Sequence, residues 1–153
     1  MSRFIGYIWQ VILLLVWAMW WGGLSFYAIF VVPTGTEQIG SVSQGFITQQ
    51  VTMWHNGLTG VFLLCLLLEA FKRGNRWLWS MTFGLAFIEV GLVYWHRHLT
   101  SEMDFVAQSV PSSFYRQHAV YLWLTAAEWL IGVGLAFWWC RLKMQTMLKQ
   151  EDA

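Results

Sequence analysis

Charged residues are scarce in this chain: Asp, Glu, Lys and Arg make up 11% of its 153 residues, against 58% that are apolar. A water-soluble domain of this length could not bury so much apolar surface in its interior. The formal net charge is only +1 at pH 7, and no basic extramembrane segment is visible, which argues against a nucleic-acid partner. The composition therefore predicts an integral membrane protein.

Cysteine and proline are also rare, with two of each. Cys65 and Cys140 do not form a Cys-x-x-Cys pair, and we expect both to pack within helices. The motifs of common soluble enzymes are missing as well. The sequence has no Gly-x-Ser-x-Gly element, no phosphate-binding glycine loop and no His-Glu-x-x-His element. No motif therefore indicates enzymatic activity.

Long apolar runs are what the chain has in abundance. Each run reaches the roughly 20 residues that a helix needs to cross the hydrocarbon core of a bilayer. The first run has no small-residue cleavage site, so we expect it to remain as a span. We predict a single domain over residues 1–153, an all-α integral membrane bundle of four antiparallel helices. The four predicted helices cover about 5–32, 48–71, 77–96 and 118–140.

Basic residues gather in the connections on one side of this predicted bundle. Seven Lys and Arg residues fall on one side and two on the other. Because basic loops stay in the cytoplasm, both termini should be cytoplasmic, and the membrane should be a bacterial inner membrane or an equivalent one. The seven are Arg3, Lys72, Arg73, Arg76, Arg141, Lys143 and Lys149, and the two are Arg97 and Arg116.

The connections differ in kind. Residues 72–76 form a short turn, so the helices on either side should be adjacent and antiparallel. The segment 33–47 begins with Pro33, which is expected to stop the first helix, and contains three glycines. The segment 99–113 ends in a proline and two serines, which are expected to cap the fourth helix. We predict that these two segments are external loops.

All four histidines lie toward the predicted external ends of the runs. At a rise of about 1.5 Å per residue, His55, His96 and His118 come near one layer of the membrane. Imidazoles there could ligate haem iron or a transition metal, and Glu102 and Asp104 could add oxygen ligands or orient a ligand histidine. His55 and His118 are the first choice for such a pair. Alternatively, these histidines are only hydrogen-bonding anchors between helix ends.

Glu89 and Glu128 form a second group, inside the predicted membrane. Each lies 13 residues from the basic residue at the cytoplasmic end of its helix, so both should lie about 20 Å from that edge. Since an ionised carboxylate is costly in lipid, each should face the bundle or a wet cavity, have a partner or stay protonated. This predicts a proton path or a polar substrate pocket, or alternatively a structural polar clamp. Glu69, beside Lys72, is expected to be an interfacial charge without a special role.

Tryptophan is unusually common, with 12 residues. Most lie near the ends of the runs, where amphipathic rings favour the membrane interface. Four lie deeper and could either line a planar cofactor or fill the bundle. These four are Trp17, Trp20, Trp21 and Trp129.

Five short segments form a further pattern along the chain. They are Trp21-Gly-Gly-Leu-Ser-Phe-Tyr27, Val31-Val-Pro33, Gly45-Phe-Ile-Thr48, Phe114-Tyr-Arg-Gln-His118-Ala-Val-Tyr-Leu-Trp123 and Glu128-Trp129. Together they resemble the transmembrane-protein-205-like family, and the resemblance spans most of the chain. It implies a compact four-helix membrane domain. The biochemical activity of that family is not established, so the resemblance transfers no catalytic residue.

Three functions follow from these observations and remain open. The first is a structural or assembly component that contacts the lipid bilayer and other membrane subunits or further copies of itself. The second is a redox protein with haem b or a transition metal at the histidines near the external side. The third is a proton or small-solute pathway past Glu89 and Glu128.

Overall fold

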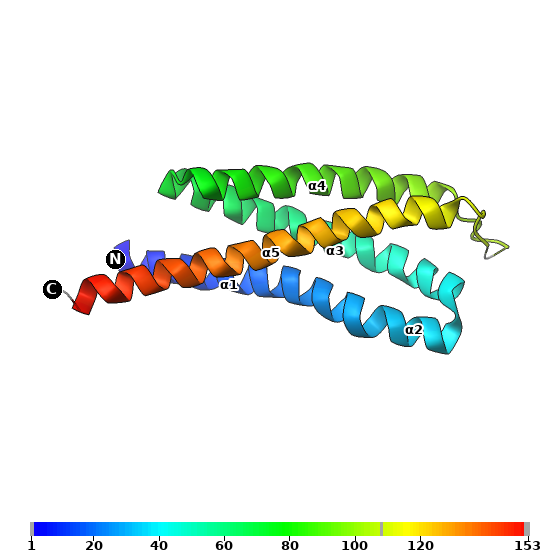
Figure 1. Ribbon diagram of the computed structural model, residues 1–153, viewed down its shortest axis with the longest axis horizontal. Helices are drawn as coiled ribbons and strands as arrows, with labels where there is room; N and C mark the ends of the chain where they lie inside the picture. The colour runs from blue at the N-terminus through cyan, green and yellow to red at the C-terminus, as the bar shows by residue number, and fades with distance from the viewer. Residues whose placement is uncertain (1, 108, 152–153) are drawn as a thin grey trace.

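The computed structural model describes residues 2–107 and 109–151, and almost all of this part is helical (Figure 1). Four of its helices are long and apolar enough to cross a membrane: Phe4–Ile39, Ser41–Arg73, Arg76–Ser101 and Phe114–Arg141. Within the described residues there is no strand, only an isolated bridge between Asp104 and Ser109. The predicted fold class, an all-α membrane bundle with four spanning helices, is confirmed, and the protein is an integral membrane protein.

The first spanning helix consists of three successive pieces. They are α1 (Ser2–Phe26), a π-helical turn η1 (Tyr27–Val31) and α2 (Val32–Ile39). The other three spans are α3 (Ser41–Arg73), α4 (Arg76–Ser101) and α5 (Phe114–Glu151). α1 packs on α3, α3 on α4, α4 on α5, and α5 returns to α1, so the four spans form a closed ring.

The two ends of the bundle carry different residues. Figure 1 shows the beginning of α1, the end of α5 and the α3–α4 turn together at one end. We call this the basic end, after Lys72, Arg73, Arg76 and Arg141. The α2–α3 link and the loop 102–113 lie at the other end (Figure 1). We call that end the histidine end, because it carries His96, His98 and His118.

Pro33 does not stop the first helix, and the predicted loop 33–47 is not formed. Proline has no N–H to bond the carbonyl of Ile29, and its ring crowds that carbonyl. The wider π-helical turn directly before it accommodates both effects, and the helix continues to Ile39. The chain reverses at Gly40 alone, whose φ of 82° suits glycine, and α3 begins at the next residue. In lipid, a continuous helix also satisfies backbone groups that a long loop would leave unpaired.

The helices extend beyond the apolar runs at other places too. α4 continues to Ser101 instead of ending near residue 96, and α5 begins at Phe114 instead of near residue 118. The predicted short turn between the second and third helices is present. There, Gly74 takes the left-handed conformation with φ 60°, and Asn75 Oδ1 accepts from the N–H of Leu78 at 3.1 Å.

Buried positions recur every seven residues along the helices, which is the spacing of helices that pack at a small crossing angle. On α4 this stripe begins at Leu78 and includes Leu85, Leu92 and Leu99, all buried. The outward faces carry large apolar side chains, among them Phe87 at 81% exposure and Val90 at 70%. Such a surface is suited to lipid and not to water.

Candidate functional site

Each of the four spans contributes one buried polar side chain to the middle of the bundle. α1 supplies Trp20, α3 supplies Thr59, α4 supplies Glu89 and α5 supplies Glu128, and none is more than 8% exposed. We call these four residues the polar layer. Two of the four, Glu89 and Glu128, are the intramembrane acids predicted from the sequence, and both are buried in the bundle.

Glu128 is the centre of the polar layer. Its Oε1 accepts from the indole N–H of Trp20 at 3.0 Å, and Thr59 Oγ1 lies 3.2 Å from the same oxygen. The Trp20 N–H also lies 3.0 Å from Thr59 Oγ1, so α1, α3 and α5 meet at one point. His55 Nε2 is 3.6 Å from Glu128 Oε1, beyond hydrogen-bond distance.

Two polar atoms next to this centre have no partner. Glu89 Oε2 and His55 Nε2 are buried, and neither makes a hydrogen bond within the described residues. Buried polar atoms in native proteins are nearly always paired with protein or ordered water. The region around Glu128 therefore has unused capacity to bind a proton, a water molecule or a ligand.

A cavity of about 700 Å³ extends from Glu128 toward the histidine end. We call it the histidine cavity, because His55, His96 and His118 all line it. Most of its wall is apolar, and all four spans contribute to it. Its volume lies within the range of about 300–1,000 Å³ that is usual for small-molecule sites.

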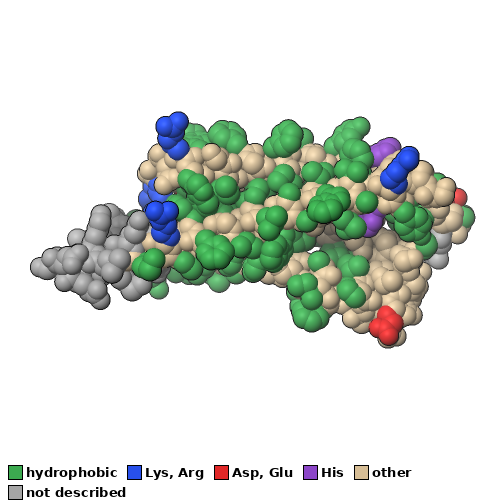
Figure 2. All heavy atoms as spheres, in the orientation of Figure 1, with side chains coloured by type: hydrophobic (Ala, Val, Ile, Leu, Met, Phe, Trp, Pro, Cys, Tyr) green, Lys and Arg blue, Asp and Glu red, His purple; other side chains and the backbone are tan. Residues whose placement is uncertain are grey.

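The cavity exists because the end of the first span leans away from α5. Within the described part, α2 packs on η1 and α3 but not on α4 or α5. Figure 1 shows α2 diverging from α5, and Figure 2 shows a hollow between them with a histidine side chain at its edge. The cavity thus opens sideways, where lipid would surround the protein.

Polar contacts fasten the leaning segment to α3. The hydroxyl of Tyr27 donates to Thr48 Oγ1 at 3.0 Å, and Gln44 Nε2 donates to the same Tyr27 oxygen at 3.4 Å. A Cβ at Gly35 would overlap the end of the Gln44 side chain, so α2 approaches α3 closely at this glycine. These contacts fix one wall of the cavity while leaving the side toward α5 open.

The α5 wall is a stack of three rings. His118 lies between Phe114 and Tyr121, with ring centroids 5.7 Å and 6.2 Å away and interplanar angles of 12° and 11°. The three rings are therefore nearly parallel. These rings form an aromatic wall on α5. Further along the same helix, toward the basic end, the cavity lining continues with Thr125 and Glu128.

The structure places four of the seven site residues predicted from the sequence in one cavity, and Glu89, Glu102 and Asp104 are not among its lining residues. The four that line it are His55, His96, His118 and Glu128. Gln117 Nε2 donates to Glu102 Oε1 at 3.1 Å, which ties the end of α4 to α5. Asp104 Oδ1 accepts from two backbone N–H groups of its own loop, each at 2.9 Å.

The predicted metal ligands are divided between the histidine cavity and the loop 102–113. In the part of the chain that the structure describes, no three His, Cys, Asp or Glu side chains are placed to hold one metal ion. Within that part, no three of His55, His96, His118, Glu102 and Asp104 are therefore gathered around one point. His55, His96 and His118 nevertheless share one cavity.

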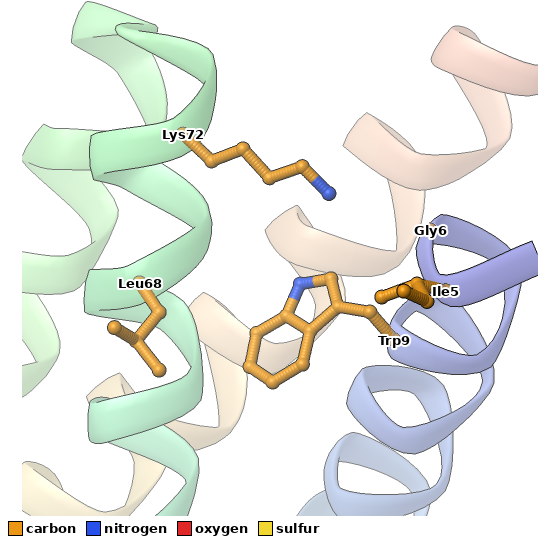
Figure 3. Close-up of a pocket in the computed structure, with 5 residues that line it drawn as sticks. All are labelled: Ile5, Gly6, Trp9, Leu68 and Lys72. Carbon is orange, nitrogen blue, oxygen red and sulfur yellow. The ribbon is translucent and has the colours of Figure 1, made fainter. Parts of the chain in front are cut away.

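Glu69 differs from its expected role. The side chain is 1% exposed, accepts from Trp9 Nε1 at 2.7 Å and from Gln10 Nε2 at 2.9 Å, and pairs with Arg73. The expectation of an interfacial charge without a role is wrong, because Glu69 joins α1 to α3 at the basic end. A cavity of about 330 Å³ lies beside it between the same helices, lined by Ile5, Gly6, Trp9, Leu68 and Lys72 (Figure 3).

The four deep tryptophans pack between the helices of the bundle, which agrees with the prediction that they fill it. Trp21 Nε1 donates to the carbonyl of Trp129 at 3.1 Å, and Trp17 Nε1 donates to that of Gly132 at 3.3 Å. Trp129 Nε1 in turn donates to Ser25 Oγ at 2.9 Å. None of these tryptophans lines the histidine cavity. Their N–H groups instead hold α1 against α5.

Comparisons of the chain with protein-family models, with curated proteins and with solved structures find no match.

Proposed function

We propose that this protein binds a lipid-soluble small molecule in the histidine cavity. The observation that carries the proposal is a cavity of about 700 Å³ with mainly apolar walls and with Glu128 and His55 among its lining residues. Apolar walls favour a molecule that is already dissolved in the bilayer. The polar groups at the deep end would orient the molecule. The sideways opening visible in Figure 2 provides the route of entry from lipid.

The packing between the polar layer and the basic end favours a binding site with a single entrance rather than a channel that is open at both ends. Trp20, Phe62, Leu66, Leu85 and Leu135 belong to one buried core cluster on the side of the basic end. A cluster packed in this way leaves no room for a solute to continue. In place of a small-solute pathway across the membrane, the proposal is a small-molecule binding site that is reached from one half of the membrane. A proton path past Glu89 and Glu128 stays a prediction.

A cavity-filling substitution tests the proposal. Gly23 lines the cavity, and a Cβ there meets nothing within 4 Å, whereas its neighbour Gly22 has equal space but does not line the cavity. The probe is triphenylphosphine oxide, a neutral lipophilic molecule, measured by equilibrium dialysis with protein in nanodiscs. We expect Gly23→Phe to abolish binding and Gly22→Phe to retain it. Equal binding to the wild type and to Gly23→Phe would contradict the proposal.

Haem b is a second candidate occupant. His55, His96 and His118 share one cavity, and His55 Nε2 makes no hydrogen bond, so an imidazole nitrogen is free to bind iron. Protein produced with excess haem should then show a Soret band that is lost in His55→Ala or His118→Ala. A protein that stays colourless under these conditions argues against haem, and metal analysis of the same sample addresses a bare ion.

The membrane and the orientation are also proposals. We place the protein in a bacterial inner membrane with both termini in the cytoplasm. The clustering of Lys and Arg at the basic end supports this orientation (Figure 2). We also propose membership of the transmembrane-protein-205-like family, which the four-helix membrane fold supports. If the cavity binds no ligand, a structural or assembly role with membrane subunits or further copies of this chain is the remaining proposal, and no nucleic-acid partner is proposed.

A further inference from the structure

We infer that the molecule taken up by the histidine cavity is a lipophilic organic cation, such as an amine or an onium compound with apolar substituents. This inference rests on the proposed binding function and specifies the class of ligand. Among the lining residues within the described part, Glu128 is the single acid, and there is no Lys or Arg. The cavity thus has one carboxyl group and no side chain that carries a permanent positive charge.

The contacts of Glu128 leave a position for a cation. The contacts that the structure gives Glu128 are all made by its Oε1, which accepts from Trp20 on α1 and contacts Thr59 on α3. The nearest side chain that can become positive is His55, at 3.6 Å. Ionisable side chains inside the membrane almost always face the bundle interior or a water-filled cavity, pair with one another, and mark substrate or ion pathways. The partner that this site lacks is therefore a cation supplied from outside the protein.

Glu89 on α4 adds a second acid beside the first. It is 8% exposed, its Oε2 has no hydrogen bond, and it lies close enough to Glu128 for the two carboxyl groups to interact electrostatically. The two acids therefore lie near each other at the deep end of the cavity, where the imidazole of His55 is 3.6 Å from Glu128. A bound cation would be attracted by the carboxylate of Glu128, whereas an anion would be repelled by it.

The walls suit the apolar part of such a ligand. Six aromatic residues line the cavity: Phe26, Tyr27, Trp54, Phe114, Tyr115 and Tyr121. The faces of aromatic rings attract cations, more strongly when the cation is removed from water, as it is here. A neutral molecule of the same shape gains the apolar contacts but not this attraction. Selectivity for positive charge is consequently the property that the structure specifies.

Three probes of related shape test the inference in nanodiscs made of phosphatidylcholine, a lipid without net charge. They are tetraphenylphosphonium, which is positive, triphenylphosphine oxide, which is neutral, and tetraphenylborate, which is negative. We expect the wild type to bind the cation at least about tenfold more tightly than the neutral probe, a difference of about 1.4 kcal/mol. The anion should bind most weakly. This comparison needs no substitution, so it stays valid if a variant fails to fold.

Variants then assign the selectivity to Glu128. Glu128→Gln should reduce the affinity for tetraphenylphosphonium about tenfold or more and leave the affinity for the neutral probe unchanged. Glu128→Asp, which keeps the carboxylate, should retain part of the preference. Glu69→Gln is the matched control, because Glu69 is equally buried but lies at the basic end, outside the cavity. It should bind all three probes as the wild type does.

The outcomes separate the two levels of the proposal. Equal affinity for the cation and the neutral probe, both abolished by Gly23→Phe, would overturn the inference about charge and leave the binding function in place. Binding of no probe to the wild type, or binding that Gly23→Phe does not change, would overturn both. Loss of cation binding in Glu69→Gln as well as in Glu128→Gln would also overturn the assignment to the cavity.

Discussion

At the scale of single residues, the two fully buried acids are held in different ways. Glu69 is completely engaged by Trp9, Gln10 and Arg73, which makes it a structural connection. Glu128 lines a cavity and has only neutral donors and an imidazole nearby. Since a buried carboxylate needs hydrogen bonds or an opposite charge, the donors around Glu128 matter for stability.

We predict that Trp20→Phe destabilises the protein. The substitution removes the N–H that Glu128 and Thr59 accept, while a smaller aromatic ring remains to pack on Phe62. We expect the free energy of unfolding in detergent to fall by about 1–2 kcal/mol. Trp123→Phe is the control, since Trp123 is 78% exposed, and it should change that free energy by less than about 0.5 kcal/mol. Equal unfolding of the two variants would show that the Trp20 hydrogen bonds contribute nothing.

At the scale of helices, the contact between α1 and α5 is unusually close at one position. A Cβ at Gly132 would overlap the indole of Trp21, whereas a Cβ at Gly134, on the same helix, would meet only Met81 Sδ at 3.9 Å. Gly132→Ala should therefore push α1 away from α5 and lower the free energy of unfolding by about 1–3 kcal/mol. Gly134→Ala should leave it unchanged or raise it by up to about 1 kcal/mol. Equal stability of both variants would contradict the close packing of Trp21 on Gly132.

The helices also show what the sequence could predict and what it could not. The four spans and the burial of Glu89 and Glu128 were predictable, because apolar runs and intramembrane acids are local signals. The continuation of the first helix through Pro33 was not, since it depends on a π-helical turn that has no sequence signature. Glu69 lies seven residues after Phe62, and both are buried, so the helical spacing of apolar residues on this span is a sequence signal for the burial of Glu69.

The candidate site was predictable to a similar degree. Helix geometry places His55, His96 and His118 near one layer, and the three do line one cavity. The volume of that cavity could not be predicted, because it results from the tilt of α2 away from α5. The engagement of Glu102 by Gln117 likewise depends on tertiary packing across 15 residues of sequence. Local patterns locate polar residues, whereas the space between helices is a property of the assembled bundle.

At the scale of the whole molecule, the orientation decides which half of the membrane supplies the ligand. If the basic end is cytoplasmic, the histidine cavity opens into the outer leaflet. A fluorescent protein fused to the carboxyl terminus should then be fluorescent, and alkaline phosphatase at the same point should be inactive. An active phosphatase fusion would reverse the orientation and place the entrance in the inner leaflet.

The orientation should also respond to charge, since basic residues in short connections determine it. Lys72→Gln together with Arg76→Gln removes two charges from the α3–α4 turn but leaves Arg73, which pairs with Glu69 and is needed for packing. We expect a mixed population in which part of the phosphatase fusion becomes active. The matched control is Arg97→Gln together with Arg116→Gln at the histidine end, which should keep the phosphatase inactive. Because both pairs remove two positive charges, a similar response from each would mean that total charge, and not its distribution between the two ends, orients the bundle.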